Sequence, residues 1–227
     1  MKSKLKSFFL DLLFPKTCFG CQKEETYLCQ DCESILEISD IHKKLNIEQL
    51  SDLYFALEYK KPLIKQLIQQ FKYQSFVKDL SKPLSYLIIN HFKLIEKNKN
   101  EFKNFTTVPV PLYIKRLKWR GFNQAEEIAK HISSFFETPL VSDVLVRNKK
   151  TLPQTELSEN KRRRNILGVF DCENQEKIKN QNILLIDDIY TTGSTIKECA
   201  KVLKNAGAKK IIAIVVARAV PKEDYFS

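Results

Sequence analysis

Two adjacent carboxylates, Asp187 and Asp188, follow the apolar run 183–186, and a loop rich in hydroxyl groups comes directly after them. The apolar run is typical of a buried parallel strand, and the pattern of residues 196–206 predicts a helix. A loop between a strand and a helix turns backbone N–H groups toward one spot, which suits a phosphate. Ionised carboxylates only accept hydrogen bonds, so the acid pair suits vicinal hydroxyls and the segment predicts a sugar-phosphate site. The loop residues expected to hold the phosphate are Thr191, Thr192, Gly193, Ser194 and Thr195.

A plainer interpretation makes this segment an ordinary turn in which Ser194 or Thr195 caps the helix. A cap does not need two carboxylates at a strand end, and neither G-x-x-x-x-G-K-[ST] nor G-x-G-x-x-G occurs in the sequence. The segment resembles the phosphoribosyl-pyrophosphate (PRPP) signature of type I phosphoribosyltransferases. The resemblance implies that Asp187 and Asp188 hold the ribose hydroxyls and that residues 191–195 hold the 5-phosphate.

Four cysteines near the start of the chain form two CxxC pairs with seven residues between them. Four thiolates in two close pairs suit a tetrahedral zinc ion and leave no open position, so we expect a structural zinc site. Redox pairs and an iron–sulfur cluster stay open as alternatives. The predicted metal ligands are Cys18, Cys21, Cys29 and Cys32. Cys172 and Cys199 stand alone and are expected to be ordinary buried residues.

The residues before the cysteines show an apolar helical face with lysines nearby. This pattern predicts an amphipathic helix that either docks on the protein or makes a peripheral contact with a membrane. No apolar run approaches the roughly 20 residues of a membrane-spanning helix. No small-residue cleavage site follows residues 2–14, so we expect a cytoplasmic protein. The residues of the apolar face are Leu5, Phe8, Phe9, Leu12 and Leu13.

Positive charge is concentrated in one part of the chain, whose formal net charge is +11. Residues 1–50 hold seven Lys/Arg and eight Asp/Glu. Residues 115–164 hold twelve Lys/Arg and six Asp/Glu. Such a concentration favours polyanions, either nucleic acid or pyrophosphate, although a solvated lysine-rich surface is the plainer alternative. Part of it falls in the long polar stretch 148–164, whose length is typical of a lid or a binding loop. The cations that we expect to cover pyrophosphate are Arg116, Arg120, Lys149 and Lys150.

Aromatic side chains alternate with cations between Tyr113 and Phe122. Cations can follow the phosphates of a single strand while aromatic faces stack on its bases, in a sequence-tolerant manner. Trp119 is flanked by two cations and is the best stacking candidate, whereas Phe122 is expected in the core. The residues predicted to contact nucleic acid are Lys115, Lys118, Trp119, Arg162, Arg163 and Arg164. For residues 162–164, plain surface charge is an equal alternative.

Strand and helix patterns alternate after a charged connector at 39–51. The predicted strands are 53–59, 105–110, 139–146, 183–186 and 210–217, and the predicted helices are 62–73, 80–95, 123–136 and 196–206. This alternation indicates an α/β fold with a parallel sheet flanked by helices, and ligands in such sheets lie beyond the carboxyl ends of the strands. We therefore expect residues 1–50 to hold the amphipathic helix and the zinc-binding module, and residues 52–220 to form the phosphoribosyltransferase-like domain.

Several motifs together resemble the ComF family, whose members are associated with DNA uptake in naturally competent bacteria. They are the CxxC pairs, Pro109-Val-Pro111, Arg120-Gly-Phe-Asn-Gln124, the stretch 155–165 and the PRPP loop. The resemblance implies a type I phosphoribosyltransferase-like domain behind a small zinc-binding module, with PRPP and Mg²⁺ as ligands. It also implies that the protein handles incoming single-stranded DNA together with other DNA-uptake proteins.

Two functions stay open on the sequence. One is a Mg²⁺-dependent phosphoribosyltransferase (a glycosyltransferase) of nucleotide metabolism, and the other is a module that binds PRPP without turnover. Pro109 and Pro111 stand where the transferases usually carry small, glycine-rich residues, and proline has no N–H to offer a pyrophosphate. This difference speaks against nucleobase transfer.

Overall fold

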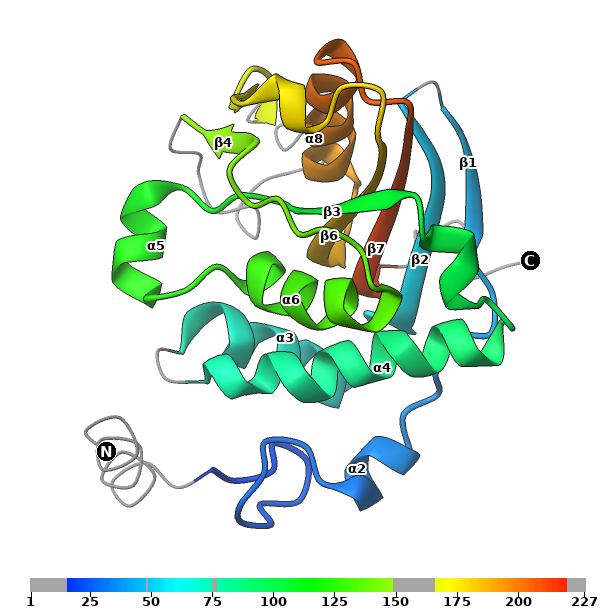
Figure 1. The fold of residues 1–227 in the computed structure, drawn as a ribbon. Helices are drawn as coiled ribbons and strands as arrows, with labels where there is room; N and C mark the ends of the chain where they lie inside the picture. Colours follow the sequence, from blue (N-terminus) through cyan, green and yellow to red (C-terminus); the bar gives the residue numbers. More distant parts are fainter. Residues whose placement is uncertain (1–15, 48, 75–76, 149–165, 220–227) are drawn as a thin grey trace, which may run out of the picture.

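The computed structural model describes residues 16–47, 49–74, 77–148 and 166–219. A five-stranded sheet forms its centre, with the strand order β1-β2-β7-β6-β3 (Figure 1). Four strands run parallel, and β1 is an antiparallel strand at the edge. The strands are β1 (Lys43–Ile47), β2 (Leu50–Glu58), β3 (Phe105–Pro109), β6 (Asn182–Tyr190) and β7 (Lys210–Arg218). A second, two-stranded sheet consists of β4 (Leu145–Arg147) and β5 (Phe170–Cys172).

Helices cover both faces of the large sheet (Figure 1). On β6, Leu184 and Ile186 join the apolar cluster of α3, α4 and α6, whereas Ile183 and Leu185 join the cluster of α8. Because both faces of this strand are buried, its sequence is an unbroken apolar run. The predicted α/β fold, a parallel sheet flanked by helices, is confirmed. The helices are α3 (Pro62–Tyr73), α4 (Ser81–Leu94), α6 (Gln124–Phe136) and α8 (Ser194–Asn205).

The carboxyl ends of β3 and β6 lie side by side. Pro109 is the register partner of Ile186, and the next residue, Val110, donates its N–H to the carbonyl of Ile186 at 2.9 Å. On the other side of β6, Asp187 is the register partner of Val215 in β7. β6 continues beyond the predicted 183–186 to Tyr190, so the acid pair belongs to the strand itself.

Three elements differ from the sequence-based expectation. The strand predicted at 139–146 begins only at Leu145; before it, Leu140 makes an isolated bridge with Thr107, beside Pro139, which has no N–H to donate. The connector predicted at 39–51 contains β1 and the start of β2. Residues 114–120 form a helix, α5 (Ile114–Arg120), that no sequence pattern had indicated.

The cysteine-rich segment and the short helix α2 (Gln30–Ser34) lie beyond α3 and α4, away from the sheet (Figure 1). Leu28 and Leu36 of this segment belong to the same buried cluster as the inner sides of α3 and α4. The module is therefore packed on the main core, and the domain boundary at residues 50–52 stays a prediction. Within the described ranges, no helix is long and apolar enough to cross a membrane.

Candidate functional site

The acid pair lies at the carboxyl end of β6 and is joined there by a lysine. The Asp188 side chain is 7% exposed, and its carboxylate Oδ1 lies 2.9 Å from Nζ of Lys72, in the last turn of α3. The backbone N–H of Asp188 donates to Oδ1 of Asp187 at 2.9 Å. Burial, and after it the charge of Asp188, raise the pKa of Asp187 to about 7. The charges of the two carboxylates thus act on one another, and one cation already balances part of their charge.

The hydroxyl-rich loop connects β6 to the N-terminus of α8, as the phosphate-site hypothesis requires. Thr192 Oγ1 and Ser194 Oγ lie 2.8 Å apart, and the backbone N–H of Ser194 points to Thr192 Oγ1 at 3.4 Å. The helix starts after Gly193, which occupies the N-cap position without any side chain. Neither Ser194 nor Thr195 is the cap, so that part of the plainer interpretation is wrong. The role of residues 191–195 in holding a phosphate stays a prediction.

Gly193 makes the loop possible for two reasons. Its φ is 74°, a left-handed conformation, and a Cβ atom there would meet Tyr190 Oη at 2.2 Å. We expect Gly193→Ala to lower the free energy of unfolding by about 1–3 kcal/mol or more, from backbone strain plus this clash. Chemical denaturation measures the change. Gly207→Ala is the matched control, because its φ is 95° but its nearest heavy atom, of Lys179, would lie 3.4 Å away. Equal losses in the two variants would contradict the role of Tyr190.

Helix α5 divides its cations between two sides. Lys115, Lys118 and Trp119 have i, i+3, i+4 spacing, so they share one side of the helix, and all three are exposed, Trp119 by 62%. Arg116 and Arg120 lie four residues apart on another side, where Arg120 is only 8% exposed. The helix therefore presents an aromatic and basic side to solvent and an arginine side to the protein. Figure 1 places α5 at the periphery of the molecule.

Arg120 is held by contacts with neighbouring elements. Its Nη1 donates to Gln124 Oε1 at 2.7 Å, and its guanidinium lies 5.4 Å from the ring centre of Tyr73. Its Nε is buried and has no hydrogen-bond partner within the described residues. Burial lowers the pKa of this guanidinium, whereas the charge of Asp188 raises it. Arg120 thus lies within electrostatic range of the acid pair, and its predicted contact with pyrophosphate, like that of Arg116, stays a prediction.

Two further cations act on the acid pair and were not predicted from the sequence, Lys72 and Arg147. Arg147 ends β4, and its guanidinium lies 5.3 Å from the ring centre of Phe170. Burial and then the charge of Arg116 lower the pKa of Arg147, whereas Asp187 raises it. Neither residue had a recognisable signal, because a lysine on the polar side of a helix and an arginine at a strand end are common surface features.

The segment Pro109–Pro111 does not offer backbone donors at this edge of the sheet. Its two prolines have no N–H, and the N–H of Val110 is used in the bond to Ile186. The carbonyl of Val110 accepts from Asn123 Nδ2 at 3.0 Å, so the segment is fixed on both sides. Asn123 also caps α6, accepting from the N–H of Ala125. This arrangement speaks against a backbone cradle for pyrophosphate here.

The remaining predicted contacts lie elsewhere or outside the described residues. Lys149, Lys150 and residues 162–164 fall outside the described ranges, so their roles stay predictions. Phe122 is 6% exposed and packs against Phe71, with 5.6 Å between ring centres, which confirms its place in the core.

The four predicted metal ligands lie together in the cysteine-rich segment, on the other side of α3 and α4 from the sheet (Figure 1). Their sulfur atoms all lie within 4.8 Å of one another, and Sγ of Cys21 is 3.5 Å from Sγ of Cys29. A tetrahedral zinc with bonds of about 2.3 Å places its sulfurs roughly 3.8 Å apart, so the donor set and its spacing fit zinc. All six cysteines of the chain are free thiols. Cys199 is buried as predicted, but Cys172 is only partly buried, so that expectation was wrong.

Backbone donors surround the buried sulfurs. The N–H groups of Gly20 and Cys29 each lie 3.4 Å from Cys18 Sγ, and the N–H of Cys32 lies 3.4 Å from Cys29 Sγ. Burial raises the pKa of Cys18, but these backbone donors together lower it to about 6. A low pKa favours the thiolate, which is the form that binds a metal. Gly20 leaves no room for a side chain, since a Cβ there would lie 2.5 Å from Cys32 Sγ.

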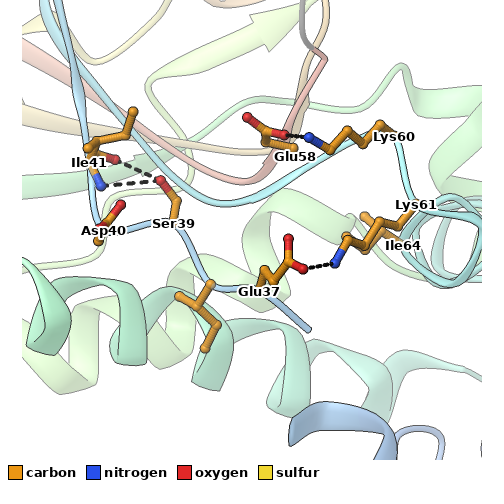
Figure 2. A pocket seen from close by; sticks show the side chains of 9 residues that line it. Glu37, Ser39, Asp40, Ile41, Glu58, Lys60, Lys61 and Ile64 are labelled. Atoms are coloured by element: carbon orange, nitrogen blue, oxygen red, sulfur yellow. Dashed lines mark hydrogen bonds and ion pairs between the residues drawn. The ribbon is translucent and has the colours of Figure 1, made fainter. Parts of the chain in front are cut away.

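A hollow of about 230 Å³ lies between residues 37–41 and the carboxyl end of β2, and its lining does not include the acid pair (Figure 2). Figure 2 shows Lys61 directed at Glu37, 2.8 Å away, and Lys60 directed at Glu58. These two ion pairs neutralise both lysines, and Asp40 leaves the lining with one net negative charge, which does not suit a phosphate. We therefore place the candidate site at the carboxyl ends of β3 and β6.

A family model described as a phosphoribosyl transferase domain matches residues 119–224. Among solved structures, adenine phosphoribosyltransferase of Trypanosoma brucei is 10% identical, with 85% of this chain and 91% of that chain covered and a TM-score of 0.40.

Curated relatives match over more of the sequence. Competence protein F of Haemophilus influenzae is 30% identical over 210 residues, which cover 89% of this chain and 90% of that protein. Competence protein ComFC of Bacillus subtilis is 28% identical over 189 residues, or 79% of this chain and 67% of that protein. DNA utilization protein YhgH of Escherichia coli (strain K12) is 29% identical over 150 residues, which cover 66% of this chain and 65% of that protein. The chain belongs to the ComF family, the family of competence protein F.

Proposed function

We propose that this protein handles incoming single-stranded DNA during DNA uptake and transformation, and that PRPP binds at its acid pair. The names of its relatives, competence proteins and DNA utilization proteins, support the role in DNA uptake. The observation that carries the proposal is the division of α5. Trp119 and two lysines lie on its exposed side, and Arg120, on its buried side, lies within electrostatic range of Asp188. One short helix thus borders both the sugar-phosphate site and a surface suited to single strands.

The exposed side of α5 has the chemistry of a single-strand platform. Stacking of a base on an aromatic ring is worth about 1–3 kcal/mol and tolerates any sequence. Lys115 and Lys118 flank Trp119 and would contact the phosphates on either side of a stacked base. Residues 162–164, with their three consecutive arginines, would add phosphate contacts.

PRPP would occupy the carboxyl ends of β3 and β6. Asp187 and Asp188 would accept hydrogen bonds from the ribose hydroxyls, residues 191–195 would bind the 5-phosphate, and Arg116 and Arg120 would face the pyrophosphate, together with Lys149 and Lys150. Mg²⁺ is usually held by one or two carboxylates plus the phosphates of its substrate, and the acid pair offers such carboxylates. When bound, the ion would neutralise part of the pyrophosphate charge.

A cytoplasmic location fits the cysteines, because six free thiols suit a reducing compartment. The partners that we propose are PRPP, single-stranded DNA and other DNA-uptake proteins. A peripheral membrane contact through the N-terminal helix would be a further partner. That helix lies outside the described residues.

Calorimetry with PRPP and Mg²⁺, followed by an assay for released pyrophosphate with each common nucleobase, tests the PRPP site. We expect binding without turnover, because Pro109–Pro111 presents no free N–H to the leaving group. Pyrophosphate release with any base would instead identify a phosphoribosyltransferase of nucleotide metabolism, and absence of binding would remove PRPP as a ligand.

Trp119→Ala is expected to weaken binding of a labelled single-stranded oligonucleotide by about 5- to 150-fold at every salt concentration, since one stacked base contributes about 1–3 kcal/mol. Trp119→Phe, which keeps a ring, should recover most of the affinity. Lys115→Gln/Lys118→Gln should instead reduce the slope of log affinity against log salt by about 1.4, because each phosphate contact on a single strand contributes about 0.7.

Fluorescence anisotropy between about 50 and 200 mM salt measures both effects. Ile114→Ala is the control, because Ile114 is also exposed on α5, by 52%, and has no ring. No binding of wild type at the lowest salt would exclude the DNA-handling role. Unchanged affinity in Trp119→Ala would place the DNA on another surface.

A further inference from the structure

Lys72 forms an ion pair inside the sugar-phosphate site. Its Nζ lies 2.9 Å from Asp188 Oδ1, and the two side chains are only 26% and 7% exposed. Burial acts against the charged ammonium, but Asp188 and then Asp187 raise the pKa of Lys72 above its usual value. A buried ion pair is roughly neutral for stability when compared with apolar residues of the same size. Stability therefore does not explain why Lys72 pairs with one of the two carboxylates. The electrostatic effect of its ammonium on Asp187 and Asp188 is the better explanation.

The neighbours of Lys72 hold it in place. The carbonyl of Phe71 accepts from Gln124 Nε2 at 2.9 Å, and the Phe71 ring packs on Phe122. On the other side, the Tyr73 ring contacts the guanidinium of Arg120 at 5.4 Å. The last turn of α3 is thus fixed to the segment that links α5 with α6, which sets the backbone position from which the Lys72 side chain reaches Asp188.

The two carboxylates repel one another where they would have to bind a ligand together. Burial and Asp188 raise the pKa of Asp187, whereas Lys72 acts in the opposite direction. An ammonium also has three donors, so one bond to Asp188 leaves two for ligand oxygens. The other charged or titratable groups whose charge acts on this cluster are Tyr59, Tyr73, Arg120, Arg147 and Cys199.

We propose that Lys72 is the positioning residue of the acid pair: its ammonium fixes Asp188 and supplies the positive charge that lets both carboxylates face the hydroxyls of one sugar phosphate. This inference rests on the proposed sugar-phosphate site and adds to it a residue from α3. Ribose 5-phosphate is the suitable probe, because it carries the diol and the 5-phosphate and needs no metal ion for its own charge balance.

The test compares Lys72→Met and Lys72→Arg with wild type by calorimetry with ribose 5-phosphate between about pH 5 and 9.5, a range that includes the plateau of the variant. Lys72→Met is expected to weaken binding at least tenfold at neutral pH and to raise the pH at which affinity reaches half its plateau by about 1, since an opposite charge at this distance changes a carboxyl pKa by about 1–3. Lys72→Arg should restore both values toward wild type. Lys65→Met, an exposed lysine on the same helix, is the control and should change neither.

A merely structural role for Lys72 would weaken binding without moving the pH midpoint, and either that result or unchanged binding in Lys72→Met would overturn the proposal. If the methionine variant does not fold, Lys72→Gln replaces it. If wild type binds neither ribose 5-phosphate nor PRPP, the proposed function fails. In that case a titration of the Asp187 carboxyl in ligand-free protein, followed by ¹³C NMR, tests the role of Lys72 separately. A higher titration midpoint in the variant than in wild type supports this role, and equal midpoints exclude it.

Discussion

Cys29→Ser is expected to abolish stoichiometric zinc binding and to open the N-terminal module. Cys29 is at the centre of the cluster: its Sγ lies 3.5 Å from that of Cys21 and accepts from the N–H of Cys32, and its own N–H points to Cys18 Sγ. A serine hydroxyl is a poor zinc ligand. Small structural zinc sites contribute on the order of 10 kcal/mol of metal-binding free energy, which the variant would lose. We also expect a lower melting temperature, because Leu28 and Leu36 pack into the cluster of α3 and α4.

Metal analysis of the purified protein and thermal unfolding with and without a chelator measure these effects. Cys172→Ser is the matched control, because this partly buried thiol lies outside the four-cysteine cluster, and it should keep both zinc and melting temperature. Full zinc content in Cys29→Ser would exclude the cluster as the zinc site. Iron and sulfide in place of zinc in the wild type would favour the iron–sulfur alternative.

The sequence predicts best those parts of the fold in which the burial of the side chains follows a simple pattern. Residues 183–186 are buried on both faces, so the chain is apolar throughout, and α3 was predicted with the bounds that the structure has, Pro62–Tyr73. Helix α5 was missed for the opposite reason. Its cations lie on two sides of a short, partly exposed helix, so its sequence shows no apolar periodicity.

The candidate site shows the same contrast. Asp187, Asp188 and the four cysteines could be proposed from the sequence because they are adjacent or regularly spaced in it. Lys72, which contacts Asp188 from α3, and Arg147 of β4, whose pKa the charge of Asp187 affects, could not be found, because both lie far from the acid pair in the sequence. Gly193 was recognised as part of the loop, but the clash with Tyr190 that requires a glycine there is visible only in three dimensions.

The acid pair should make sugar-phosphate binding depend on pH through Asp187. The pKa of this carboxyl is raised to about 7 in the free protein, by burial and by the charge of Asp188. Hydroxyl donors of a ribose favour its ionised form, so binding lowers this pKa and releases a proton. Affinity is therefore half of its plateau near pH 7, reaches the plateau about one pH unit higher, and falls at lower pH by up to tenfold per pH unit.

Asp187→Asn is expected to weaken binding of ribose 5-phosphate by roughly ten- to hundredfold at pH above 7, since hydrogen bonds to a charged acceptor are worth about 1.5–3 kcal/mol. The variant should also lose the part of the pH dependence that belongs to Asp187. The second ionisation of the sugar phosphate, near pH 6, affects both proteins alike, so the difference between their calorimetric pH profiles isolates the carboxyl. Asp188→Asn is a less direct test, because it leaves the Lys72 ammonium without its carboxylate. Asp143→Asn, in an exposed ion pair with Lys177, serves as the control. Parallel profiles for wild type and Asp187→Asn would show that Asp187 does not contact the sugar.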